Sequence, residues 1–481
     1  MWQLSAADGG LLYVSEQTQP PETEQELLPL SQRRLTVGIC VNVVAIAFES
    51  IAVATAMPVA ARALDGLAYY AWAFSLFMIG MLFATVVTGR VSDRLGPSRP
   101  LLAGVVVFAV GLVVAGTAGS MAQLVAGRFV QGLGAGVLNT ASFVLVAKAY
   151  LPRQRPRMFT YISTAWVLPA FVGPPISAWL TSHLSWHWVF FAVLPLVVGG
   201  GLMVLPTLRV LMRIPMPEVR EEDASGLPPA PFWAAALVSL AAAVFQVAGQ
   251  RLNWVGLGLA VLAVLVLLLG LPRLMPPGFL RLRRGLSSVI LVRGLLPGAF
   301  FGGEAFVPLM LVESRHVPLV LAGFALTVGA VGWTFASFLQ SQRWLNVRRD
   351  RLITFGCGSV ALGLALTGVI ALVPTLPYEL VAFAWIFSGL GMGFATASTS
   401  LAVMTLSPVD VQGRNGSSLN LFDALGSSVF VGVAGSLFAA LHPLGNQPVT
   451  FGVVLLTMAA IAVLAGFTSL RIGVVRNEVA G

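Results

Sequence analysis

Charged side chains are scarce in this sequence. Only 10% of its 481 residues are charged, 57% are hydrophobic, and the mean hydropathy is +0.89. A soluble domain carries roughly 25% charged residues, so this composition excludes an ordinary soluble globular protein. The scarcity of charge predicts a polytopic membrane protein.

Cysteine and histidine are scarce as well, with two and four residues in the chain. Cys40 and Cys357 both lie within apolar runs, which argues against a disulfide framework or a cysteine metal cluster. The histidines show no metal-ligand spacing, and we interpret them as residues of the membrane interface rather than a metal or pH-sensing site. They are His183, His187, His316 and His442.

Motifs of nucleotide and hydrolase chemistry are absent from the sequence. No G-x-x-x-x-G-K-[ST] phosphate loop occurs, which argues against an ATP-driven pump, and no H-E-x-x-H occurs, which argues against a zinc hydrolase. We therefore expect no enzymatic activity and no cofactor. The first 35 residues carry five acids before the first base, which excludes a secretory signal with a basic start.

Fourteen apolar runs are present, and most of them reach the roughly 20 residues that a membrane helix needs. They are continuous rather than alternating, which predicts helices and not a barrel. The predicted spans are 36–60, 69–91, 98–118, 121–149, 156–182, 186–207, 232–249, 252–272, 286–312, 318–340, 351–373, 378–406, 414–441 and 448–470.

These runs predict an all-α membrane protein made of two six-helix bundles and two inserted helices. The predicted parts are a cytosolic tail (1–35), an N-terminal bundle (36–207), a cytosolic linker (208–231), the inserted pair (232–272), a basic cytosolic segment (273–285), a C-terminal bundle (286–470) and a second cytosolic tail (471–481).

The basic residues predict the orientation. Arg62, Arg251 and Arg315 fall on one side of the membrane, and Arg128 and Arg293 lie within spans, whereas the other basic residues fall at the two termini and in alternate turns. By the positive-inside rule this asymmetry places both termini in the cytosol. The net charge of +9 is then a topology signal, and we expect no nucleic-acid partner.

The two predicted bundles repeat one another weakly. Residues 132–136 read G-L-G-A-G and residues 389–393 read G-L-G-M-G, an offset of 257 positions. Glu49 in the first span has a rough counterpart in Glu304 in the ninth. Internal repeats of this kind are typical of secondary transporters, whose site lies at the midplane between the halves.

Two membrane-embedded charges in the first half are the main functional candidates. A charge within hydrocarbon costs roughly 2.5–3.5 kcal/mol on insertion scales, so it indicates function by default. Glu49 and Arg128 lie about nine and seven residues from the outer ends of their spans, so their depths match within about 3 Å. Such a pair is either a static ion pair or a site that binds and releases a proton.

Four motifs of the chain resemble those of the major facilitator superfamily, drug:proton antiporter branch. The turn G-R-V-S-D-R-L-G-P-S-R-P (89–100) resembles the loop signature between the second and third helices. The segment around Glu49, F-E-S-I-A-V-A-T-A-M-P, resembles the first-helix motif, and the segment that starts at Arg128, R-F-V-Q-G-L-G-A-G, resembles the fourth-helix motif. In the fifth span the segment P-A-F-V-G-P-P-I-S-A resembles the antiporter signature, and Gly173 before Pro174 is expected to let two helices pack closely. The segment departs from the signature where Pro169 replaces a leading glycine and Ser177-Ala178 replaces a closing glycine pair.

This resemblance implies a fourteen-helix transporter that works by alternating access and uses a proton gradient as its energy source. Protonation of Glu49, opposite Arg128, would exchange against an outgoing hydrophobic or amphipathic compound, with Asp423 and Glu304 as further coupling candidates. A cytoplasmic gate is expected at the basic turn, where Asp93 would latch with Arg414. The gate residues are Gly89, Arg90, Asp93, Arg94, Gly96 and Arg414.

A substrate cavity between the halves is expected to combine apolar and polar side chains. Its candidates are Gln131, Trp166, Phe171, Arg293, Phe300 and Phe422. For Arg293, near the cytoplasmic end of its span, a structural ion pair is the favoured interpretation. The expected partners are the substrate, protons and membrane lipids, and the expected form is a monomer in a bacterial inner membrane.

Three alternatives to drug export stay open. One is a lipid or lipid-conjugate exporter on the same fold. Another is a proton-coupled importer of a sugar or small organic anion, in which Arg128 and Arg293 would bind a carboxylate. The third is a sensor or scaffold that transports nothing, against which the matched acid and base count.

Overall fold

The computed structural model describes residues 29–151, 154–212, 232–251, 253–340, 342, 347–408 and 411–476. Within these ranges the chain forms α-helices and short 3-10 turns and no strand. Most of the predicted linker, the greater part of the N-terminal tail and the last residues of the C-terminal tail lie outside the described residues.

Seven α-helices form the first half of the chain. They are α1 (Pro29–Ala63), α2 (Trp72–Leu95), α3 (Ser98–Gly116), α4 (Met121–Ala149), α5 (Arg155–His183), α6 (His187–Phe191) and α7 (Leu194–Leu211). Two helices follow as an inserted pair, α8 (Phe232–Gly249) and α9 (Trp254–Leu274).

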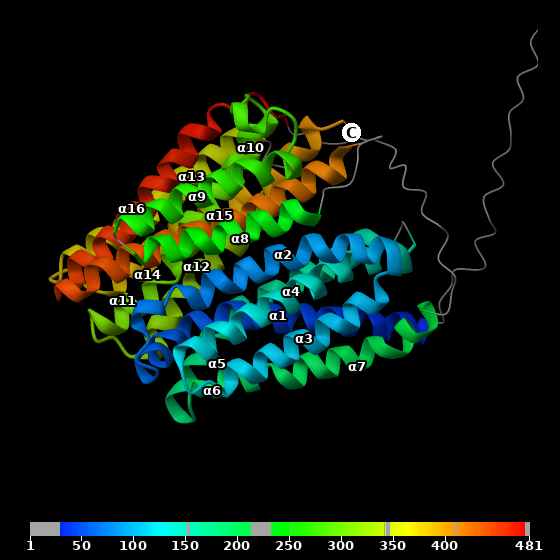
Figure 1. The fold of residues 1–481 in the computed structure, drawn as a ribbon, viewed down its shortest axis with the longest axis horizontal. Helices are drawn as coiled ribbons and strands as arrows, with labels where there is room; N and C mark the ends of the chain where they lie inside the picture. Colours follow the sequence, from blue (N-terminus) through cyan, green and yellow to red (C-terminus); the bar gives the residue numbers. More distant parts are fainter. Residues whose placement is uncertain are drawn as a thin grey trace, which may run out of the picture.

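Seven α-helices form the second half. They are α10 (Leu286–Glu304), α11 (Val307–Glu313), α12 (Leu319–Leu339), α13 (Arg349–Leu372), α14 (Glu379–Leu406), α15 (Gln412–Leu441) and α16 (Gln447–Ser469). Figure 1 shows α1 to α7 as one group of helices and α10 to α16 as a second, with α8 and α9 beside the second. Helix α8 packs against both α2 and α15, so the inserted pair bridges the two groups.

Twelve helical segments of the described chain are long and apolar enough to cross a membrane. Helices α5 and α8 occupy the two remaining predicted spans, at 156–182 and 232–249, and do not belong to those twelve. The all-helical membrane fold is thus confirmed, whereas the count of fourteen spans and the cytosolic placement of both termini stay predictions.

Several predicted boundaries are wrong in detail. The predicted turn at 89–100 is mostly helical, because α2 continues to Leu95 and α3 begins at Ser98. Only Gly96 and Pro97 connect the two helices, and Gly96 has a φ of 76°, a left-handed value that favours glycine and lets the chain reverse. Two other predicted spans are each split into two helices, at 192–193 and at 305–306.

The predicted internal repeat is visible in helix packing. A Cβ added at Gly132 or Gly136 of α4 would lie under 3.0 Å from a backbone oxygen of α2, and one at Gly134 would lie under 3.0 Å from the backbone of α3. Only glycine permits these distances. Helix α4 therefore packs closely between α2 and α3, with Gly132 and Gly136 facing α2 and Gly134 facing α3.

The second half repeats this arrangement with the glycines at 389–393. Gly389 and Gly393 of α14 approach backbone oxygens of α12, and Gly391 approaches a backbone oxygen of α13, each so closely that a Cβ would lie under 3.0 Å from it. The correspondence of 132–136 with 389–393 in the sequence thus reflects two equivalent helix triplets.

Candidate functional site

Glu49 of α1 and Arg128 of α4 form a buried ion pair between an Oε of the carboxylate and Nη1 of the guanidinium. The two residues are 0% and 1% exposed. The sequence placed them at equal depth on separate helices, and the structure brings them into contact. Their use in proton coupling stays a prediction.

Arg128 has three further contacts besides Glu49. Its Nε donates to the carbonyl oxygen of Ala73 at 2.8 Å, and its Nη1 donates to Oε1 of Gln131 at 2.7 Å. Its guanidinium carbon lies 4.3 Å from the centre of the Phe77 ring, within cation–π range. Helix α2 thus supplies a carbonyl and an aromatic face to the arginine of α4.

The carboxylate of Glu49 has fewer contacts than its partner. Its Oε2 has no hydrogen-bond partner among the described residues, nor does Nε2 of Gln131. A carboxylate in such a site is ionised only at a large desolvation cost, which a single arginine offsets incompletely. The site therefore has one group, Arg128, whose charge is well satisfied, and one, Glu49, whose charge depends on that arginine.

A second ion pair lies in the other half, between α10 and α15. Nε of Arg293 donates to Oδ2 of Asp423 at 2.9 Å, and Nη1 donates to the carbonyl oxygen of Thr396 at 2.6 Å and to Oγ1 of Thr399 at 3.0 Å. The side chain of Asp423 is 25% exposed, in contrast to the fully buried Glu49. The interhelical ion pair favoured for Arg293 is thus present, with Asp423 as its partner.

Glu304 ends α10, and its side chain makes no hydrogen bond or ion pair within the described part of the chain. Arg293 lies eleven positions earlier on the same helix and is committed to Asp423. The sequence offered Glu304 as the counterpart of Glu49, but the structure gives it no equivalent arginine.

The residues expected at the cytoplasmic gate lie at the ends of α2 and α15. Gly89, Arg90 and Arg94 belong to the last turns of α2, and no atom lies within 4 Å of a Cβ placed at Gly89, so close helix approach does not explain that glycine. Arg414 lies in the first turn of α15. The side chain of Asp93 lies outside the described residues, so its latch with Arg414 stays a prediction.

The aromatic cavity candidates are distributed over several environments. Phe300 is 3% exposed and stacks on Trp385 with ring centres 5.3 Å apart, while Phe422 packs edge-on against Phe279. Trp166 of α5 is 39% exposed, and Phe171 is half-buried. Phe300 and Phe422 therefore contribute to the core of the second half, and the structure does not gather these aromatics into one pocket.

The signature in α5 forms the seam between the two halves. A Cβ at Gly173 would meet its nearest atom, on Ile51, at an ordinary 3.8 Å, so this glycine is not required for close packing, contrary to the prediction. The close approach comes instead from Gly323 of α12, where a Cβ would lie 3.2 Å from the carbonyl oxygen of Pro174. Ser177 donates to the carbonyl oxygen of Ala52 at 2.6 Å and fixes α5 on α1.

Contacts between the halves also cluster at the predicted outer end, and the sequence did not predict them. The hydroxyl of Tyr70 donates to the carbonyl oxygen of Ala305 at 2.7 Å, and its ring lies 5.4 Å from that of Phe306. Arg62 at the end of α1 forms an ion pair with Glu313 at the end of α11. The ion pair of Arg62 and Glu313 had one signal in the sequence, which is the presence of opposite charges in outer turns that otherwise carry few charges.

No group of three or more metal-ligating side chains occurs within the described ranges. The site consists instead of two interhelical ion pairs, one in each half, and a set of contacts that join the halves at one end. Such an arrangement suits a transporter with two bundles that move relative to one another.

Comparison with known proteins identifies the class. Residues 38–431 match the sequence profile of the Major Facilitator Superfamily. The chain belongs to this superfamily of membrane transporters, and it is a multi-pass transporter rather than an enzyme.

Relatives place it beside efflux proteins. The efflux pump aunC of Aspergillus niger is 26% identical over 462 residues, which cover 88% of this chain and 77% of the pump. Multidrug resistance protein 3 of Bacillus subtilis is 29% identical over 166 residues, which cover 34% of this chain and 32% of that protein. An MFS-type transporter of Mycobacterium tuberculosis is 29% identical over 193 residues, 40% of this chain and only 28% of the relative's length. The predicted kinship with drug-efflux members is confirmed.

Solved structures show the same fold. A peptide transporter POT in complex with alafosfalin superimposes with a TM-score of 0.64 at 13% identity, covering 91% of this chain and 94% of that one. The human organic anion transporter MFSD10 gives a TM-score of 0.58 at 15% identity and covers 94% of this chain and 100% of its own. At these identities the likeness establishes the fold alone.

Proposed function

We propose that the protein is a proton-coupled antiporter that exports hydrophobic or amphipathic compounds by alternating access across a bacterial inner membrane. The observation that carries this proposal is the fully buried ion pair between Glu49 and Arg128. Buried ion pairs contribute little net stability, so a membrane protein gains little from such a pair unless it serves a function.

The contacts of the pair suit a reversible proton site. Protonation removes the negative charge of Glu49 and ends its ionic attraction to Arg128. The guanidinium then keeps the Ala73 carbonyl, the Gln131 amide oxygen and the Phe77 ring, so it is not left unpartnered. A proton can therefore enter and leave Glu49 without the collapse of its surroundings.

Coupling to movement requires that protonation alter the packing of the halves. Glu49 lies on α1, and the last turn of the same helix contains Arg62, whose ion pair with Glu313 joins the two halves. We infer that the outer contacts, from Tyr70 to Ala305 and from Arg62 to Glu313, separate when the transporter opens outward. Glu304 precedes Ala305 directly, and it is our second candidate for a carboxyl group that exchanges a proton.

The class of substrate is inferred from relatives that are named as efflux pumps and multidrug transporters. The test is proton release by purified protein in unbuffered detergent solution as lipophilic cations, lipids and anionic metabolites are added. Wild type is expected to release protons with lipophilic compounds, and Glu49→Gln to bind them without release.

Glu379→Gln is the matched control, because Glu379 is an exposed glutamate at the start of α14. Unchanged proton release from Glu49→Gln would show that Glu49 is structural and would end the proposal for this residue. Release on addition of organic anions only would favour the anion importer.

A further inference from the structure

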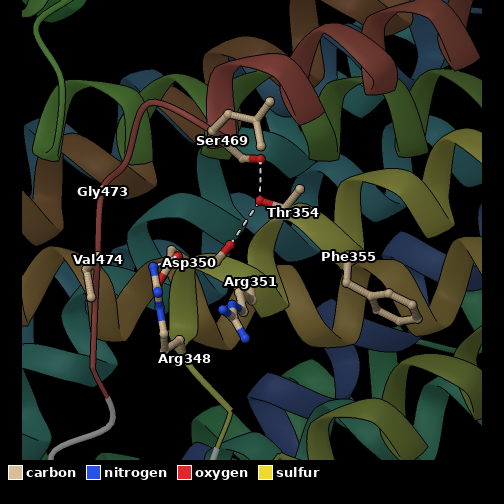
Figure 2. Close-up of a pocket in the computed structure, with 9 residues that line it drawn as sticks. Arg348, Asp350, Arg351, Thr354, Phe355, Ser469, Gly473 and Val474 are labelled. Carbon is tan, nitrogen blue, oxygen red and sulfur yellow. Dashed lines mark hydrogen bonds and ion pairs between the residues drawn. The ribbon is translucent and has the colours of Figure 1, made fainter.

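A cavity of about 340 Å³ lies where α13 begins and α16 ends (Figure 2), and no residue of either interhelical ion pair lines it. One wall is the start of α13, with Arg348, Asp350 and Arg351 close together. The other is the chain segment after α16, which runs past Gly473 and Val474 beside that helix start. The proposed transport cycle uses none of these residues.

The segment after α16 is a built wall rather than a loose tail. The N–H of Arg349 donates to the carbonyl oxygen of Val475 at 3.0 Å, and the N–H of Val475 donates to Oδ1 of Asp350 at 3.0 Å. Ile472 and Val475 are 3% and 1% exposed. These contacts fix residues 470–476 against the start of α13.

The floor of the cavity is also fixed. Thr354 of α13 and Ser469 of α16 share a hydrogen bond of 2.8 Å between their hydroxyl groups (Figure 2). The Thr354 hydroxyl also lies 3.0 Å from the carbonyl oxygen of Asp350, and the Ser469 hydroxyl lies 2.6 Å from that of Gly466, so the two hydroxyl protons are shared among these three contacts. The two helices therefore keep their spacing around the cavity.

The charge of the cavity is positive. Asp350 accepts two hydrogen bonds from Arg348, at 3.1 and 2.7 Å, and a third from Val475, so its carboxylate is neutralised. The hydrogen bond to this carboxylate raises the pKa of Arg348 above its ordinary value. Arg351 is exposed, and its guanidinium has no hydrogen-bond partner in the described part of the chain. One cationic group thus faces the cavity uncompensated.

The rim of the cavity is apolar and accessible. Phe355, Leu470 and Val474 are 61%, 68% and 60% exposed. Phe355 lies near the start of α13 and Leu470 directly follows α16, and both helices are long and apolar enough to cross a membrane. Their place at the helix ends predicts that these side chains lie at the border between the hydrocarbon and the headgroup region. The cationic Arg351 beside exposed apolar side chains is suited to bind an amphiphile that has an anionic headgroup and hydrocarbon chains.

We propose that this cavity binds the phosphate headgroup of an anionic membrane lipid, with Arg351 as the main cationic ligand and Arg348 beside it. The acyl chains would lie along Phe355 and Leu470. An arginine suits a phosphate because its fork of N–H groups matches the phosphate oxygens. Anionic lipids are attracted to basic groups at the membrane surface. A soluble phosphate compound could contact the arginines but has no acyl chains to contact the apolar rim.

The test measures lipid retained by the purified, full-length protein, by native mass spectrometry after incubation with phosphatidylglycerol, with phosphatidylcholine of the same acyl chains, or with glycerol 1-phosphate. Wild type is expected to retain phosphatidylglycerol in preference to the other two. Arg351→Gln is expected to weaken this retention about fivefold, and Leu470→Ser to weaken it without creating affinity for glycerol 1-phosphate.

Arg284→Gln is the matched control, since Arg284 is an exposed arginine of the predicted cytosolic segment that does not line the cavity. Equal loss of lipid in Arg284→Gln and Arg351→Gln would reveal a diffuse charge effect and overturn the site. Equal retention of phosphatidylcholine, or binding of glycerol 1-phosphate as tight as that of the lipid, would overturn the assignment to an anionic lipid. The elution profile in size-exclusion chromatography verifies that each variant is folded.

Discussion

The two halves share one helix scaffold but place different chemistry on it. At the offset of 257 positions that aligns the glycines of α4 and α14, Arg128 corresponds to Trp385 and Gln131 to Ser388. Arg128 forms an ion pair with Glu49 of α1, whereas Trp385 stacks on Phe300 of α10. Both side chains are fully buried, and both face the first helix of their own half.

The glycines that the halves share serve helix packing, whereas the position at which the halves differ, Arg128 in one and Trp385 in the other, is the one we connect with function. The closely packed glycines of α4 and α14 are kept in both halves because backbone contact leaves no room for a side chain. The position at the start of the motif is free to change, and only the first half carries a charge there. We therefore expect the first half to bind the proton and the second half to supply an aromatic and less charged wall.

The largest effect is expected for Arg128→Leu. It leaves Glu49 buried without its cation, which costs about 3–5 kcal/mol of stability, and it should abolish compound-dependent proton release. Thermal unfolding in detergent and the proton-release assay measure the two effects.

The double variant Glu49→Gln, Arg128→Leu is the control for that prediction. It removes both charges, so it should recover most of the lost stability but none of the proton release. If the double variant is as unstable as Arg128→Leu, the loss comes from packing of the arginine and not from an orphaned carboxylate.

Trp385→Leu, at the equivalent position in the second half, should separate stability from coupling. Removal of the stacked indole leaves a void that costs about 2–3 kcal/mol, but no charge is orphaned, so compound-dependent proton release should persist. Loss of proton release in this variant, at a temperature where it stays folded, would contradict the hypothesis that only the first half binds the proton.

Substitution of the closely packed glycines of α4 and α14 should destabilise the two halves to a similar extent. Gly132→Ala and Gly389→Ala each place a Cβ against the backbone of a neighbouring helix, and each should cost about 1–3 kcal/mol by overpacking. Gly199→Ala in α7 is the control, because no atom lies within 4 Å of an added Cβ there. Unfolding midpoints that differ strongly between Gly132→Ala and Gly389→Ala would show that the repeat is not energetically symmetric.

The smallest effect is expected for Asp423→Asn. Asp423 is partly exposed, and Arg293 keeps the Thr396 carbonyl and the Thr399 hydroxyl, so the loss should be about 1 kcal/mol. Proton release per compound bound should stay within about fivefold of wild type, because about 1 kcal/mol changes one equilibrium constant by about that factor. A complete loss of release would move the coupling site into the second half.

Most of the fold was readable from the sequence. Scarce charge, long apolar runs and the repeated glycine pattern predicted an all-helical transporter with two related halves, and the superfamily match confirms it. These features are local or periodic, and a membrane leaves a chain few ways to satisfy its backbone other than helices. The depths of Glu49 and Arg128 followed from counting residues along each helix.

What the sequence left open depends on contacts between segments far apart in the chain. The partner of Arg293, the isolation of Glu304 and the wall built by residues 470–476 follow from how helices rotate and cross, which hydrophobic composition does not encode when all faces of a helix are apolar. The same holds for Gly173, whose expected packing role belongs to Gly323 on the opposing helix. The sequence by itself determined which charges enter the membrane, and the tertiary structure alone decided which of them meet.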